Sequence, residues 1–289
     1  MSTEVAAPAL AGTARPGHRR SLPATPVLVG AVIVGLLGLA ALLAPLIAPY
    51  GENQVDFLHT LESPSLAHPM GTDDAGRDIL SRSLYGLRLD LAVVLFVTYI
   101  PLPIGVLLGS IAGYFGRGVD SVMARLADVM LAFPFFVLVI AIIAITGPGL
   151  KGVLIGVPLA GWALYFRLAR SEMLVLREQP FMLATTGLGY SRPRAILRHA
   201  VPNLMRTALI YSTLDMVVNL LLLASLSYLG LGKQPPGAEL GTIIAGGQSY
   251  LLSAWWIATL PGLVLVAFGV GVGLIGDGLS DGRLRSEAA

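Results

Sequence analysis

Long apolar stretches alternate with short polar segments along this chain of 289 residues. A helix of about 20 residues spans the roughly 30 Å of membrane hydrocarbon, so stretches of that length predict transmembrane helices. The fourth stretch is short, but Arg167 and Arg170 can lengthen it because arginine side chains reach the membrane interface from within a helix. The pattern predicts an all-α polytopic membrane protein with six transmembrane helices, at residues 27–48, 91–114, 121–146, 152–166, 207–231 and 254–276.

The same pattern divides the chain into three parts. We expect one transmembrane domain at residues 27–283, between an N-terminal tail at residues 1–26 and a C-terminal tail at residues 284–289. Two connecting segments are too polar to lie in lipid. One is acidic and covers about 49–88, and the other is basic and covers about 177–206.

Composition excludes a water-soluble globule. Hydrophobic residues make up 55% of the chain and charged residues 12%, against roughly a quarter charged in soluble domains, and the mean hydropathy is +0.78. The 19 lysines and arginines lie mostly at membrane edges, which indicates the lipid bilayer rather than nucleic acid as a partner. With the N-terminus in the cytoplasm, fourteen of them fall on the cytoplasmic side, in agreement with the positive-inside rule. We therefore expect both termini to be cytoplasmic and segment 49–88 to be external.

The spacing of the potentially catalytic or metal-binding residues matches none of the known motifs. Neither Lys151 nor Lys233 follows the glycine pattern of a P-loop, so the chain is not expected to hydrolyse ATP. The histidines have no HExxH spacing, and the absence of cysteine excludes thiolate sites. Gly276 and Asp277 lack the first glycine of the GxGD pattern of intramembrane proteases. We expect no catalytic residue, no metal and no cofactor in this chain.

Asp215 and Asn219 are polar residues inside the fifth apolar stretch. Their i, i+4 spacing places them on one helix face. A carboxylate at this depth must face protein or water, since exposure to lipid is costly. Two interpretations are open: the pair lines a translocation pathway, or it forms an interhelical hydrogen bond that stabilises packing.

Segment 177–206 is predicted to fold as a short helix, a turn at Gly189 and a second helix that leads to Pro202. Small residues at Ala184, Gly187 and Gly189 would allow another protein to approach closely. The alternative is a solvated basic connector.

This segment resembles the EAA loop of ABC-importer permeases, which docks into the partner ATPase. Ala184, Gly189 and Pro202 stand at the matching positions with the spacing kept, whereas Leu183 replaces the glutamate and Thr185 the second alanine. The resemblance implies an ATPase-docking coupling loop whose residues are Leu183, Ala184, Thr185, Gly187, Gly189, Arg192, Arg194, Arg198 and Pro202.

Further blocks are similar to the dipeptide, oligopeptide and nickel branch of these permeases, and within it to the second, DppC/OppC-like subunit. They cover residues 68–86, 224–236 and 256–281. The resemblance implies the type I ABC-importer permease fold and ATP-driven import of peptides or a related small solute across the bacterial cytoplasmic membrane. It also implies three partners: a homologous second permease, two ATP-binding subunits or domains that hold ATP and Mg²⁺, and an extracytoplasmic substrate-binding protein.

The external segment carries a charged group formed by Asp73, Asp74, Arg77 and Asp78. These side chains either contact the binding protein or the second permease, or they pair with one another in a local turn. An ATP-independent channel or secondary transporter is the alternative function, and an intramembrane enzyme is a third. A secondary transporter more often shows inverted repeats and several intramembrane ionisable groups. Only Asp215 lies well inside a predicted span.

Overall fold

The structure is a computed structural model that describes residues 24–287, with only the backbone described at Thr186 and at 281–287. The N-terminal tail predicted at residues 1–26 therefore lies almost wholly outside the described residues. The described chain is mostly helical, and its elements follow in this order: α1 (Ala24–Leu42), α2 (Ala44–Ile47), α3 (Ile79–Tyr99), α4 (Pro101–Phe115), α5 (Arg117–Leu131), α6 (Phe135–Thr146), α7 (Leu150–Leu176), α8 (Pro180–Gly187), α9 (Arg192–Ala195), the π-helical turn η1 (Ile196–Ala200), α10 (Val201–Tyr228), α11 (Leu240–Gly247), the 3₁₀ turn η2 (Gln248–Tyr250) and α12 (Trp256–Glu287).

Five helical segments of the described chain are long and apolar enough to cross a membrane. They are α1, the continuous α3–α4 pair, α7, the continuous α9–η1–α10 segment, and α12. The bent α5–α6 pair makes a sixth if it is counted as one span. The six predicted apolar regions are therefore confirmed, and α7 extends past Arg167 and Arg170 as expected.

Three helix boundaries differ from the prediction. The first helix ends at Leu42 instead of continuing to residue 48, because Pro45 has no N–H to donate to the next turn. The span expected at 121–146 is divided into two helices: α5 and α6 meet at 86°, with Pro134 at the bend. Helix α12 continues to Glu287, into the expected C-terminal tail at 284–289.

The polar segment expected at 49–88 is shorter than predicted, because α3 begins at Ile79. Asp78 is its N-cap, and the carboxylate accepts a hydrogen bond from the Ser81 N–H at 2.7 Å. A carboxylate at this position stabilises the unpaired amides of the first turn. The first ten residues of α3, which include charged side chains, are therefore helical.

Glycines bring α4 and α7 into close contact. Gly105, Gly109 and Gly113 repeat every four residues along α4, and a Cβ added at Gly105 would lie only 2.5 Å from the Trp162 carbonyl oxygen. Repeated small residues allow membrane helices to pack backbone to backbone. These glycines therefore allow α4 and α7 to pack closely within the bundle.

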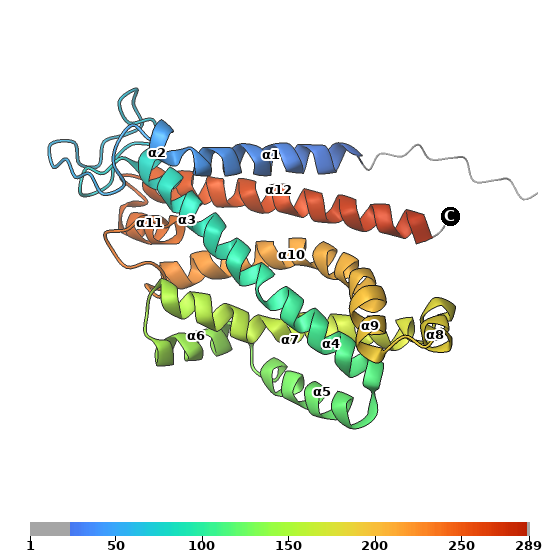
Figure 1. Ribbon diagram of the computed structural model, residues 1–289. Helices are drawn as coiled ribbons and strands as arrows, with labels where there is room; N and C mark the ends of the chain where they lie inside the picture. Colours follow the sequence, from blue (N-terminus) through green and yellow to red (C-terminus); the bar gives the residue numbers. More distant parts are fainter. Residues whose placement is uncertain (1–23, 288–289) are drawn as a thin grey trace, which may run out of the picture.

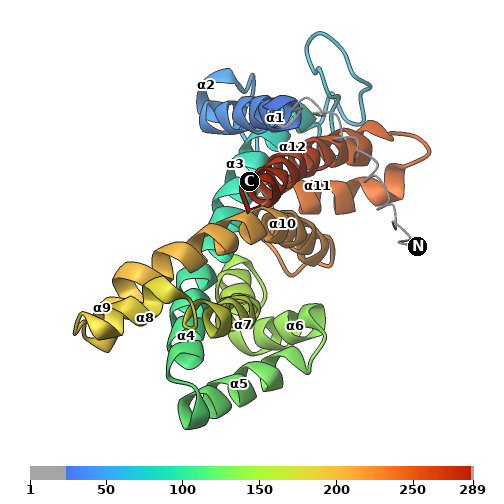
Figure 2. The ribbon, with the colours of Figure 1, turned by 90° about the vertical axis from the view of Figure 1, so that its right-hand side faces the viewer.

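The arrangement of the helices separates two ends of the molecule (Figure 1). Helix α1 lies antiparallel to α12, so the start of α1 and the end of α12 are at the same end as α8 and α9. The loop between α2 and α3 lies at the opposite end, together with α11. In the end-on view, α8 and α9 project from the bundle beside α4 (Figure 2).

Candidate functional site

The connection between α7 and α10 forms a compact projecting element that consists of α8, α9 and η1. Buried side chains anchor it to the bundle: Met182 on α8, Ala195 on α9 and Ala200 on η1 belong to one apolar cluster with Met173 and Leu204. Because Met173 lies on α7 and Leu204 on α10, the projecting element packs against both of these helices.

A tight turn at Gly189 joins α8 to α9, as predicted. Gly189 has φ +73°, and the Tyr190 N–H donates to the Thr185 carbonyl at 3.0 Å. A 6→1 backbone hydrogen bond together with a glycine of positive φ is the Schellman motif, which ends many helices. Glycine is favoured here because a side chain in the left-handed region costs about 1–2 kcal/mol.

The outer face of α8 is apolar and uncovered in this chain. Leu183 is 58% exposed and Leu188 is 71% exposed. Ala184 is exposed too, and a Cβ added at Gly187 or Gly189 would meet no described atom within 4 Å. Thr185 differs: it is buried, and its Oγ1 donates to the Met182 carbonyl at 2.7 Å.

Three exposed arginines border this apolar face. Arg192 stacks over the Phe115 ring at 5.7 Å and Arg194 over the Tyr190 ring at 5.4 Å, and Arg198 is exposed beside them. Pro202 is exposed near the start of α10, directly after the π-helical turn η1. Between residues 177 and 206 the sequence has one acidic residue, Glu178, and it pairs with Arg177 at 3.1 Å. The surface is therefore apolar with a cationic border.

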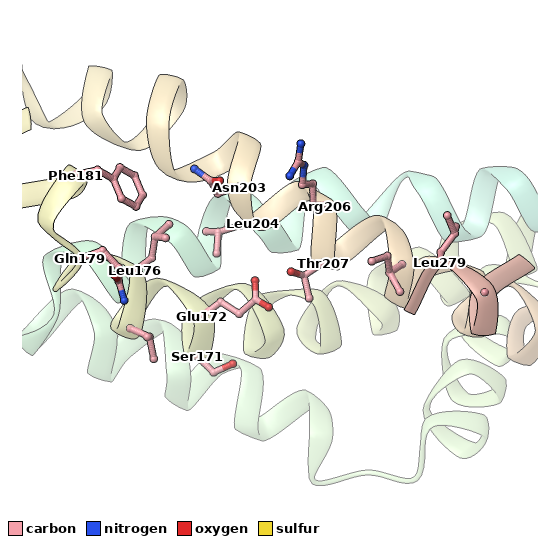
Figure 3. Close-up of a pocket in the computed structure, with 13 residues that line it drawn as sticks. Ser171, Glu172, Leu176, Gln179, Phe181, Asn203, Leu204, Arg206, Thr207 and Leu279 are labelled. Carbon is pink, nitrogen blue, oxygen red and sulfur yellow. The ribbon is translucent and has the colours of Figure 1, made fainter. Parts of the chain in front are cut away.

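A cavity of about 1070 Å³ lies directly beside this element (Figure 3). One wall comes from α7 and includes Glu172 and Leu176, and the other comes from α10 and includes Asn203, Leu204 and Arg206. Phe181 at the start of α8 and Leu279 on α12 complete the lining. Sequence reasoning missed this cavity, because its lining combines residues of α7, α10 and α12 that only the packing of these helices brings together.

Asp215 and Asn219 share one face of α10, as predicted, and belong to a hydrogen-bonded network. Tyr165 of α7 donates its O–H to Asp215 Oδ2 at 2.8 Å. The Asn219 amide donates to the same oxygen at 3.0 Å and to Thr98 Oγ1 of α3 at 3.0 Å. Neither residue lines the large cavity. The network joins three helices, which favours the packing interpretation over the pathway one.

The charged group of the external segment is largely directed inward. Asp73 is buried, accepts hydrogen bonds from the N–H groups of Ala75 and Arg77 at 2.9 Å, and binds Arg77 Nε at 2.7 Å. Asp78 is also buried: it caps α3 and contacts His68 Nδ1 at 2.9 Å. Asp74 alone of the three carboxylates stays exposed, 3.7 Å from Arg77. This geometry favours the internally paired turn.

Buried carboxylates at α11 escaped the sequence analysis. Glu239 is fully buried, where its Oε2 accepts the Lys233 N–H at 2.6 Å, and burial raises its pKa. Asp90 on α3 is buried as well and accepts the Leu240 N–H at 3.2 Å. Glu52 links the external segment to this region by accepting from Lys233 Nζ at 2.8 Å. An acidic residue directly before an apolar stretch, as at Asp90, was the available signal.

Comparison with known proteins places the chain in a family. Residues 105–283 match the family described as binding-protein-dependent transport system inner membrane component, and residues 25–64 match the N-terminal TM domain of oligopeptide transport permease C. The chain belongs to the binding-protein-dependent transport permeases. Family members are non-catalytic membrane subunits of ABC transporters, as the sequence resemblance implied.

Curated relatives cover most of this permease subunit. It is 38% identical to the dipeptide transport system permease protein DppC of Alkalihalophilus pseudofirmus over 254 residues, which cover 88% of this chain and 84% of the relative. It is 36% identical to the probable D,D-dipeptide transport system permease protein DdpC of Escherichia coli, over 87% of this chain and 84% of the relative. It is 34% identical to the oligopeptide transport system permease protein OppC of Bacillus subtilis, over 88% of this chain and 83% of the relative.

A solved structure has the same fold. The inward-facing MetNI methionine ABC transporter matches with a TM-score of 0.54 and 16% identity, over 69% of this chain and 93% of the MetNI chain. The type I importer fold is therefore confirmed. Family and fold support a transporter subunit and give no support to the channel, secondary-transporter or enzyme alternatives.

Proposed function

We propose that this permease subunit is half of the membrane pathway of an ATP-driven importer for dipeptides or oligopeptides. The proposal includes a homologous second permease, two ATPase subunits or domains, which bind the ATP and Mg²⁺, and an extracytoplasmic binding protein that selects the cargo. It rests on family membership and on the peptide systems to which the curated relatives belong.

The projecting element of α8, α9 and η1 is the coupling device in this proposal. It offers an exposed apolar face at Leu183 and Leu188 and a cationic border at Arg192, Arg194 and Arg198. Because Leu183 replaces a glutamate, docking here relies on apolar contact and on acidic groups of the ATPase. ATP-driven closure of the ATPases would push on this element and move α7 and α10, which its buried side chains contact.

The proposed orientation in the bacterial inner membrane follows from charge and geometry together. Helices α8 and α9 lie at the same end of the molecule as the start of α1 and the end of α12 (Figure 1). Most lysines and arginines flank that end, so the positive-inside rule assigns it to the cytoplasm. The external segment and α11 would then face the binding protein, with Asp74 and Arg77 as accessible contacts.

Purification of the tagged subunit from native membranes tests the proposal. Mass spectrometry should recover a second permease and P-loop ATPases, and the purified complex reconstituted with its binding protein should import peptide only with ATP. Recovery of this chain alone, with uptake in liposomes that contain no ATP, would refute the importer assignment.

A further inference from the structure

Helix α5 carries a narrow apolar stripe that is largely uncovered in the described chain. The α5 stripe consists of Val119, Val122, Leu126 and Val129, together with Phe133 directly after the helix. Their exposed fractions run from 45% at Val119 to 71% at Val122. The residues follow one another at intervals of three, four, three and four positions, which is the a and d spacing of a heptad repeat. Because α5 lies at the edge of the molecule, the stripe is open to a neighbour (Figures 1 and 2).

Another face of α5 holds the helix on the bundle. Ala127 is buried in an apolar cluster with residues of α4 and α7. Two carboxylates of α5 pair with arginines of α7: Asp120 Oδ2 accepts from Arg170 Nη2 at 2.6 Å, and Asp128 Oδ1 accepts from Arg167 Nη2 at 3.0 Å. Since these contacts fix α5 in place, the exposed stripe is not needed for the folding of this chain.

The charges of α5 argue against a surface covered by lipid. Four of the 15 residues of this helix are charged: Arg117, Asp120, Arg125 and Asp128. Charged side chains at membrane depth face protein or water, because exposure to lipid is costly. Arg125 is exposed and directly precedes Leu126 of the stripe. Lipid packed on the stripe would therefore also contact this guanidinium.

Arg125 is a charge that the described part of the chain leaves without a carboxylate within 4.0 Å. With Leu126 as an a residue of the heptad, Arg125 occupies the g position. Residues at this position form ion pairs between helices and determine which partner is chosen. The stripe and Arg125 together match a helix that has an apolar seam of its own and a carboxylate beside it.

We propose that the α5 stripe packs against a helix of the homologous second permease, and that a carboxylate of that helix pairs with Arg125. The contact rests on the proposed import function and adds to it the part of this chain that meets the second permease. It also gives a mechanical connection, because the ion pairs of Asp120 and Asp128 link α5 to the end of α7 that leads into α8. Movement of the coupling element would therefore be transmitted to the contact between the two permeases.

Photocrosslinking in native membranes tests the proposed contact. The photoreactive residue p-benzoylphenylalanine is introduced at Val122, at Leu126 or, as the matched control, at Ser121. Ser121 is also exposed and is adjacent to Val122, but a helix turns by about 100° per residue, which places it on the polar face. Val122 and Leu126 should form adducts with the second permease, identified by mass spectrometry, at yields at least fivefold above Ser121.

Charge reversal tests the ion pair in the same complex. Arg125→Glu should lower the amount of second permease that co-purifies with this chain at least fivefold, whereas Arg125→Lys should retain most of it. Membrane insertion should stay normal in both, because this side chain has no carboxylate partner among the described residues. Replacement by lysine of the acidic residue in the crosslinked segment of the second permease should restore co-purification with Arg125→Glu.

The outcomes separate this contact from the import function. Adducts with lipid alone at Val122 and Leu126, or equal yields at Ser121 and Val122, overturn the α5 contact. Normal co-purification of Arg125→Glu overturns it as well. If the wild-type chain still brings down a second permease and ATPases, the import function stands after any of these results. Recovery of the wild-type chain without a second permease refutes the import function itself.

Discussion

Replacement of Gly187 by methionine separates the stability of this chain from its coupling to a partner. Gly187 ends α8, has no left-handed backbone and is exposed, and a Cβ added there would meet no described atom within 4 Å. Within this chain the methionine therefore has room. Removal of a glycine from a helix stabilises it by up to about 1 kcal/mol, so the subunit itself should be unharmed or slightly stabilised.

A docked ATPase would respond in the opposite way. If the apolar face of α8 fits closely into a partner groove, the added side chain overpacks that contact at a cost of roughly 1–3 kcal/mol. Because each 1.4 kcal/mol is a factor of ten, ATPase affinity should fall by about 5- to 150-fold. Peptide-stimulated ATP turnover and uptake should fall with it.

The assay compares Gly187→Met with Gly246→Met. Gly246 is also an exposed helical glycine whose Cβ would meet no described atom within 4 Å, but it lies on α11 at the other end of the molecule. ATPase association is measured by titration of the purified ATPase onto the permease pair in nanodiscs, and thermal unfolding is measured in parallel. Gly246→Met should behave as wild type in both. Normal ATPase affinity and uptake for Gly187→Met would show that this face of α8 is not the docking surface.

Three further predictions concern the turn, the helix packing and the external segment. Gly189→Val forces a β-branched residue to φ +73° and should uncouple uptake from ATP turnover while membrane insertion stays normal. Gly189→Asn should retain most uptake, because asparagine tolerates this backbone conformation. Equal uptake in the two variants would contradict the role of the turn. Gly109→Leu should lower the free energy of unfolding of the subunit by roughly 1–3 kcal/mol or abolish its folding. The new Cβ would clash with the Phe166 carbonyl oxygen and lie 2.8 Å from the Arg170 backbone nitrogen. An unchanged melting temperature in detergent would refute this packing. Partial burial raises the pKa of Glu52, but the hydrogen bonds that the carboxylate accepts from Lys233 and the Ala238 N–H outweigh burial and lower the pKa below its ordinary 4.5. The stabilisation by this carboxylate is therefore present above pH 4.5 and is lost as pH falls through the lowered pKa. The melting temperatures of wild type and Glu52→Gln should therefore differ at pH 7 and converge in acid, and a constant difference across this range would exclude the ion pair as the cause.

Hydrophobic patterning determined the class of this protein and the order of its spans. The apolar runs are so long that only lipid can surround them, and no tertiary contact is needed to recognise them. The turn at Gly189 was predictable for a related reason, since a glycine after a helical run permits a local left-handed ending. The glycine repeat at 105, 109 and 113 was equally visible in the sequence, and it indicates close helix packing.

The roles of the polar residues were decided by tertiary structure. The sequence left two roles open for Asp73 and Asp78, and the structure shows that both carboxylates are buried and used inside the chain, by Arg77, Ser81 and His68. Asp90 and Glu239 lie 149 positions apart in sequence yet are buried at the same end of α11. The large cavity likewise needs α7, α10 and α12 together. Span positions follow from the local free energy of transfer to lipid, whereas a polar site depends on which distant groups the packed helices bring within hydrogen-bond distance.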